Sequence, residues 1–118
     1  SHESFKVFQF KECKIAIGLN ASGNDEIRKA WASKDDTWMH LDELKSSHAI
    51  VKLNSPLHLN QEILDYAASI IADYSQFKGD MIPVVYTFVK YIKGVKGTSG
   101  KVIFKKEKRR LCKRINYL

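Results

Sequence analysis

One long run of helical periodicity constrains the fold of this chain more than any other feature. Within residues 61–77, apolar side chains recur three or four positions apart, at Ile63, Ala67, Ile70, Tyr74 and Phe77. Asn60 is a good N-cap for this segment, and Gly79 stands where a C-cap glycine is common. The spacing therefore predicts one helix over 61–77, with its apolar stripe buried against the rest of the molecule.

Most of the remaining chain has the patterns of β-strands, which alternate apolar and polar residues or form short β-prone runs. Pro83 restricts one of these runs to the edge of a sheet or to the start of a strand. Pro56 interrupts the segment before the long helix, which is predicted to be a loop. The predicted strands are 5–10, 13–18, 36–41, 48–53, 81–89 and two within 101–116, on either side of the charged turn KKEKRR.

A second, shorter helix is predicted after the loop GLNASGND (18–25), with Ser22 or Asn24 as its N-cap. At 118 residues the chain has the size of one domain, which we expect to span 1–118. The opening residues 1–4 bring no apolar side chain to a core and are set apart as a remnant foreign to the domain. Because strands outnumber helices and come mostly in adjacent pairs, we predict an α+β fold: a largely antiparallel β-sheet with one long and one short helix packed on it.

The positive charge of the chain is concentrated in its last third. Residues 1–77 hold eight Lys or Arg against eleven Asp or Glu, whereas residues 78–118 hold twelve against two. This distribution favours a polyanionic partner, because neutralising phosphates releases their condensed counterions. We therefore predict nucleic-acid binding; the alternative is an ordinary solvent-exposed surface that is rich in lysine.

Candidate phosphate contacts lie in two segments of this basic third. KGVKGTSGK (93–101) offers flexible glycine-rich backbone with free N–H groups, and it lacks the GxxxxGK[ST] spacing of a nucleotide-hydrolysing loop. The second segment is a predicted hairpin at 105–114. A plain lysine-bearing hairpin loop is the alternative for the first segment, and a solvated turn for the second. The residues expected to contact phosphate are Lys93, Lys96, Lys101, Lys105, Arg109 and Arg110.

The stretch DDTWMHLDELKSSH (35–48) allows three interpretations. As a strand, 36–41 places Asp36, Trp38 and His40 on one face. Trp38 is then either a platform on which a base stacks or a core residue whose indole N–H is satisfied internally, and the core interpretation is slightly favoured. The third interpretation is a general base or a metal site built from Asp36, His40 and His48. No nucleophile motif or standard ligand spacing supports it, so no catalytic residue, metal or cofactor is predicted.

The cysteine content and the hydropathy indicate a reducing, cytoplasmic setting. Cys13 and Cys112 belong to no CxxC motif, and the sequence leaves open whether they meet. No apolar run approaches the roughly 20 residues that a membrane-spanning helix needs, and no signal-peptide pattern opens the chain. We expect no membrane partner.

Four stretches, in this order, resemble the NFACT-R (NFACT RNA-binding) domain of the family that includes RqcH, fibronectin-binding-protein-A-like proteins and nuclear export mediator factor. They are GLNASGND (18–25), DTWMHLDELKSSH (36–48), YSQFKGDMIPVVYT (74–87) and KGVKGTSGKV (93–102). The resemblance covers residues 12–104, and its most specific part is the D-x-W-x-H…S-H element. Trp38, His40, Ser47 and His48 of this element are the residues expected to add a more specific nucleic-acid-binding surface.

The resemblance implies a non-enzymatic RNA-binding module, with tRNA or ribosomal RNA as its partner, in ribosome-associated quality control and the rescue of stalled large subunits. It leaves open whether the domain stands alone or works with other domains of a longer rescue factor. Two alternatives remain: a metal-assisted enzyme acting on nucleic acid through Asp36, His40 and His48, and a protein-interaction module that pairs through an edge strand at 82–88.

Overall fold

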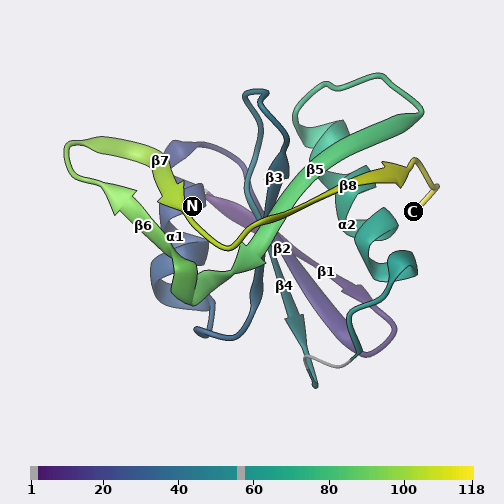
Figure 1. Ribbon diagram of the computed structural model, residues 1–118, viewed down its shortest axis with the longest axis horizontal. Helices are drawn as coiled ribbons and strands as arrows, with labels where there is room; N and C mark the ends of the chain where they lie inside the picture. The colour runs from purple at the N-terminus through teal and green to yellow at the C-terminus, as the bar shows by residue number, and fades with distance from the viewer. Residues whose placement is uncertain (1–2, 56–57) are drawn as a thin grey trace.

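The computed structural model describes residues 3–55 and 58–118 (Figure 1). Pro56 and the first two of the four opening residues lie outside the described residues. The elements, in chain order, are β1 (Phe5–Phe10), β2 (Cys13–Gly18), α1 (Ala21–Glu26), the π-helical turn η1 (Ile27–Trp31), β3 (Thr37–Leu41), β4 (Ala49–Leu53), α2 (Gln61–Tyr74), β5 (Met81–Phe88), the 3-10 turn η3 (Val89–Tyr91), β6 (Ile92–Val95), β7 (Thr98–Phe104) and β8 (Lys108–Lys113).

Six strands form one antiparallel sheet in the order β1-β2-β4-β3-β5-β8, so that β1 and β8 are its edges. Among the described residues, β6 and β7 pair only with each other and form a separate hairpin, at the left of Figure 1. The predicted α+β class, with a largely antiparallel sheet and one long and one short helix, is confirmed. Neither helix in the described part of the chain is long and apolar enough to cross a membrane.

Helix α2 covers one face of the sheet and forms the larger core cluster with it. Met39, Val51 and Val84 are fully buried beneath Ile70 and Ile71 of the helix. Because side chains alternate along a strand, this is the face of β3 opposite to Trp38. Cys13 and Cys112 are both buried in this cluster and both are free thiols, which answers the question the sequence left open.

The opposite face of the sheet carries α1, η1 and the β6–β7 hairpin. Trp38 and Ile50 from the sheet are buried there against Ile27 and Ile92, and Val102 and Phe104 of β7 close this smaller cluster. β7 therefore belongs to this layer, while β8 joins the sheet beside β5. The predicted hairpin at 105–114 is wrong, since β7 and β8 pair with different strands.

Helix α2 begins as predicted and ends earlier than predicted. The Asn60 side chain accepts a hydrogen bond from the Ile63 N–H at 2.9 Å. The helix stops at Tyr74 because Gln76 adopts a left-handed conformation (φ 59°), which lets the Phe77 N–H bond back to the Ala72 carbonyl at 2.8 Å. This is a Schellman cap in which glutamine takes the place usually held by glycine. Gly79 is thus not the cap residue.

Helix α1 starts earlier than predicted. Its N-cap is Asn20, whose side chain accepts from the Gly23 N–H at 2.8 Å, and neither Ser22 nor Asn24 has this role. A Cβ at Gly23 would lie 1.7 Å from the Ser4 carbonyl oxygen, so only glycine permits this close approach. The Ser4 carbonyl also accepts from the Leu19 N–H at 2.9 Å, which ties the start of the chain to the helix.

β5 is an interior strand, flanked by β3 and β8. Pro83, its third residue, is tolerated because the pairing with β3 ends at Val84. The Pro83 carbonyl accepts from the Asp42 N–H at 2.9 Å, just beyond that point, so Pro83 faces β3 outside the segment paired with β3, while it lies opposite Leu111 on the β8 side. The alternative of a partner that pairs with an edge strand at 82–88 is therefore wrong.

Candidate nucleic-acid interface

Trp38 is the centre of a buried cluster on the hairpin side of the sheet. Only 1% of its surface is exposed, and its indole N–H donates to Nδ1 of His48 at 3.2 Å. Its ring stacks on His40, with centroids 5.6 Å apart, and packs on Phe104 at 5.1 Å. The core interpretation of Trp38 holds, because a base cannot reach a ring face that is covered in this way.

His48 is buried as a neutral group. Burial, and then the neighbouring His40, lower the pKa of His48 to about 3. Since the indole can only donate, Nδ1 of His48 carries no proton and the ring proton sits on Nε2. The backbone N–H of His48 donates to the Asn24 side chain at 3.1 Å, which joins this residue to helix α1.

His40 lies at the border between the buried cluster and the surface. Burial lowers the pKa of His40, although the Leu41 carbonyl and Asp42 oppose this shift. Nδ1 lies 2.5 Å from the Leu41 carbonyl oxygen, which can only accept, so Nδ1 carries the proton. At neutral pH the Nε2 atom is then an acceptor, suited to a hydroxyl or amino group of a ligand.

A polar depression of about 810 Å³ opens above these histidines. It lies where the start of α1, the β3–β4 connection, the end of α2 and the start of β7 meet. The Ser47 N–H donates to the Ser75 hydroxyl at 2.9 Å and thereby joins two of these walls. Among the residues that line it are Asn24, His40, Lys45, Ser47, His48 and Lys101. The structure thus brings together three of the four predicted motif residues with one predicted lysine. Lys45 also lines the depression, although it was not among the predicted residues. The only indication of it in the sequence was its position between the two halves of the motif.

The outer face of the β6–β7 hairpin carries lysines. Val102 and Phe104 point into the smaller core cluster, so the alternate positions, Lys101 and Ile103, point away from it. Lys93 is paired with Ile103 and shares this outer face, and Lys96 lies in the turn beside Gly97, whose φ is 83°. Within residues 3–55 and 58–118, none of these three lysines forms an ion pair with a carboxylate.

The hairpin is anchored to α1 through Asp25. Its carboxylate accepts from the Ser99 hydroxyl at 2.9 Å, from the Gly100 N–H at 3.0 Å and from Arg28 at 3.3 Å. Burial alone would raise the pKa of Asp25, but these hydrogen bonds and the Arg28 charge outweigh it and lower the pKa. The segment predicted to be flexible backbone is therefore a paired hairpin, and the Gly100 N–H is not free.

The other predicted cations lie apart from the depression. Arg109 is paired with Asp42 at 3.1 Å and with Glu107 at 3.2 Å, while Arg110 donates to the Gln61 side chain at 2.7 Å. Lys105 lies beside Tyr91, with its ammonium 6.0 Å from the ring centroid. Arg109 already has carboxylate partners, so less of its charge is available to phosphate than that of an unpaired lysine.

Asp36 does not join the two histidines in a metal site. Its carboxylate accepts from Lys52 at 2.7 Å and from the Ser33 N–H at 2.8 Å. In the part of the chain that the structure describes, no group of three or more His, Cys, Asp or Glu side chains is placed to hold a metal ion. The structure therefore does not contain the metal site at Asp36, His40 and His48 on which the alternative of a metal-assisted enzyme depends.

Comparison with known proteins agrees with this fold. The sequence profile described as "NFACT protein RNA binding domain" matches residues 4–106. The Rqc2 homolog RqcH of Bacillus subtilis (strain 168) is 29% identical over 84 residues, which cover 70% of this chain and 14% of that protein. The solved C-terminal structure of the fibronectin/fibrinogen-binding protein from Streptococcus suis superposes with a TM-score of 0.83 at 21% identity, covering 98% of this chain and 47% of the other. The chain thus spans 14% of the RqcH relative and about half of the solved C-terminal structure.

Proposed function

The chain belongs to the NFACT RNA-binding domain family, and from this premise we propose that it binds RNA through the outer face of the β6–β7 hairpin and the adjoining polar depression. RNA binding is implied by the name of the family. The ligand that we propose is tRNA or ribosomal RNA of the large subunit, bound in the cytoplasm during the rescue of stalled ribosomes. The domain contributes binding and no catalytic step.

The observation that carries this proposal is the set of unpaired lysines on the hairpin. Lys93, Lys96 and Lys101 are exposed and, among the described residues, have no carboxylate partner. Their charge is therefore fully available to neutralise phosphates, which releases counterions and supplies most of the affinity of such interfaces. The Asp25 anchor holds the hairpin in place before RNA arrives, so that less conformational entropy is lost on binding.

The depression supplies contacts that depend on the chemistry of the ligand. Lys45 and Lys101 line it together with the neutral imidazoles of His40 and His48 and the Ser47 side chain. Neutral donors and acceptors next to lysines suit a ribose 2′-hydroxyl or a base edge adjacent to a phosphate, and the 2′-hydroxyl is what distinguishes RNA from DNA.

The likeness to part of RqcH supports a place for this domain within a longer factor. We propose that other domains of such a factor supply its remaining contacts with the ribosome, and that this domain adds an RNA contact whose strength is set by the hairpin lysines.

Fluorescence anisotropy with bulk tRNA at several salt concentrations tests the proposal. In the variant Lys93→Glu/Lys96→Glu/Lys101→Glu we expect at least about 10-fold weaker binding near 0.1 M salt, and a slope of log K against log salt smaller by roughly two. The matched control reverses three exposed lysines elsewhere, Lys6, Lys14 and Lys78. Equal losses in both variants mean that only bulk charge matters, and a salt-independent affinity contradicts the proposal.

A further inference from the structure

Two aromatic rings remain accessible where β5 leads into β6. Phe88, the last residue of β5, is 37% exposed, and Tyr91, the last residue of η3, is half-buried. Their ring centroids lie 6.2 Å apart, with the ring planes tilted by 58°. Unlike Trp38, Phe88 therefore offers ring surface to a ligand in solution.

Three lysine ammonium groups gather around the Tyr91 ring. Lys106 lies 4.9 Å, Lys90 5.6 Å and Lys105 6.0 Å from its centroid, and Lys90 also lies 5.1 Å from the centroid of Phe88. Only Lys90 has a carboxylate partner among the described residues, Asp35 at 3.0 Å. Like charges gathered in this way repel one another, and a polyanionic ligand relieves that repulsion.

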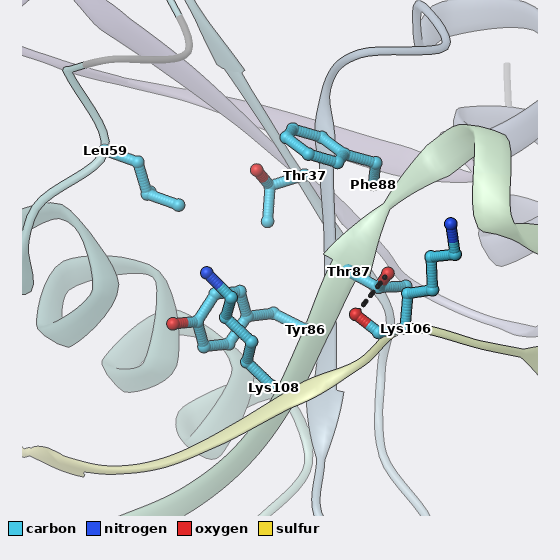
Figure 2. A pocket seen from close by; sticks show the side chains of 7 residues that line it. All are labelled: Thr37, Leu59, Tyr86, Thr87, Phe88, Lys106 and Lys108. Carbon is cyan, nitrogen blue, oxygen red and sulfur yellow. Dashed lines mark hydrogen bonds between the residues drawn. The ribbon is translucent and has the colours of Figure 1, made fainter.

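The lysines are held at this place by backbone contacts. The Thr87 hydroxyl donates to the Lys105 carbonyl at 2.9 Å and lies 3.4 Å from that of Lys106, a contact drawn in Figure 2. The Lys105 N–H donates to the Tyr91 carbonyl at 3.2 Å. The connection between β7 and β8 is thus fixed against the end of β5, so the cations and the rings are presented together in the unbound protein.

A small pocket of about 80 Å³ lies directly beside Phe88 (Figure 2). Thr37, Leu59, Tyr86 and Thr87 line it together with the Phe88 ring, and Lys106 and Lys108 complete its lining. An apolar wall with hydroxyl and ammonium groups around it is the combination that recognises the edge of an unpaired base, and the volume admits part of one base.

We propose that this aromatic–lysine surface, made of Phe88, Tyr91, Lys105 and Lys106, binds a single-stranded segment of RNA. One unpaired base stacks on the Phe88 ring, and the flanking phosphates lie at Lys105 and Lys106. The inference rests on the proposed function because it takes RNA as the ligand. It adds a preference that the hairpin lysines alone do not give, since bases inside a duplex are not available for stacking.

The test compares a single-stranded RNA octamer that contains one 2-aminopurine with a duplex of the same length. The variant Phe88→Leu/Tyr91→Leu removes the rings and keeps apolar side chains. We expect it to bind the single strand roughly 10-fold more weakly, to bind the duplex unchanged, and to lose the fluorescence change of 2-aminopurine that stacking produces in the wild type. Unchanged single-strand affinity, or an equal loss for the duplex, overturns the inference.

A second variant keeps the test valid if the leucine variant does not fold. Phe88→Trp enlarges the stacking surface, and we expect single-stranded RNA to quench the fluorescence of the new tryptophan and to bind at least as tightly as before. Indole fluorescence that does not respond to a saturating single strand overturns the inference.

The hairpin variant separates the two proposals. If Lys93→Glu/Lys96→Glu/Lys101→Glu loses tRNA and duplex binding but keeps a stacking signal that depends on Phe88, both proposals are supported. If that variant binds tRNA like the wild type while Phe88→Leu/Tyr91→Leu loses the single strand, the hairpin proposal fails and this inference stands. If the wild-type protein binds neither tRNA nor the single-stranded octamer, both proposals are contradicted.

Discussion

The two faces of the six-stranded sheet are covered in different ways. On one face a single helix, α2, buries a continuous apolar layer against the strands. On the other face the smaller cluster around Trp38 is closed by three short pieces, α1, η1 and the β6–β7 hairpin. Buried polar groups concentrate on this second face, where Asn24, Asp36 and His48 have less than a tenth of their surface exposed.

This difference separates stability from recognition. An apolar layer stabilises without specifying much geometry, whereas buried hydrogen bonds such as the one from Trp38 to His48 fix the orientation of each partner. The hairpin and the depression lie on the polar face, whereas Phe88 and its pocket lie at the end of β5 on the α2 side, because Leu59 and Tyr86 of that pocket pack with the α2 cluster. Most of the α2 face is then a scaffold that holds the sheet, while the proposed ligand groups lie on the polar face and at the end of β5.

The largest expected effect comes from damage to the scaffold face. Ile71 of α2 is completely buried, so Ile71→Ala should lower the free energy of unfolding by about 2–5 kcal/mol through lost burial and the cavity left behind. Urea denaturation measures this loss. Ile103→Ala is the control, because Ile103 is 59% exposed on the hairpin and should change stability by less than about 0.5 kcal/mol. At urea concentrations below the unfolding transition, Ile71→Ala should bind RNA as tightly as the wild type. A loss of RNA affinity under these conditions shows that the two faces are not independent.

Lowering the pH should reduce the free energy of unfolding through the polar face, at a pH that leaves the scaffold face unaffected. The pKa of His48 is about 3 in the folded protein and about 6.5 when unfolded, so below pH 6.5 the unfolded chain binds a proton that the folded chain does not. Stability should therefore fall by up to about 1.4 kcal/mol per pH unit, or roughly 2 kcal/mol between pH 6.5 and 5. The lowered pKa of His40 acts in the same direction.

Urea denaturation at pH 7, 6 and 5 measures this dependence. His48→Gln removes the titrating group, so its stability should change less with pH than that of the wild type. If the stability of His48→Gln depends on pH as that of the wild type does, another group causes the acid response.

The smallest expected effect on global stability comes from the hairpin anchor. Asp25→Ala removes the acceptor for Ser99 and Gly100 and leaves Arg28 without its carboxylate, at a cost of about 1–2 kcal/mol. Most of the effect should be local, with faster hydrogen exchange at the Gly100 amide than in the sheet. Asp35→Ala removes an exposed ion pair with Lys90 and is the control, with no measurable change in stability expected. Unchanged exchange at Gly100 in Asp25→Ala would show that the hairpin does not depend on this carboxylate.

Features set by neighbouring residues could be predicted from the sequence, and features set by distant ones could not. The cap at Asn60 and the alternation of Trp38 with Met39 depend on a few adjacent positions, and both were predicted correctly. The end of α2 depends on Gln76 adopting a conformation that glutamine rarely adopts, which no local pattern signals. The start of α1 depends on the approach of Gly23 to Ser4, a contact across nineteen positions that the sequence does not reveal.

The candidate sites divide in the same way. The lysines of 93–101 and the histidines of the motif could be named from the sequence, but their meeting at one depression depends on where α1 and α2 end. Phe88, Tyr91 and Lys106 were missed because they lie on two segments that are distant in sequence and are joined by the Lys105–Tyr91 and Thr87–Lys105 hydrogen bonds. Trp38 is buried because a second layer, which includes β7, covers this face of the sheet. The predicted hairpin at 105–114 did not indicate this layer.

The basic edge strand β8 has a consequence for how copies of this protein behave at high concentration. An edge strand exposes unpaired backbone groups that invite edge-to-edge pairing and aggregation, and Leu111, 57% exposed, adds apolar surface to this one. Lys108, Arg109, Arg110 and Lys113 occupy four of the six positions of β8, so two such edges repel each other before they can pair. The charge of β8 thus serves colloidal stability, and variants that neutralise it should precipitate more readily.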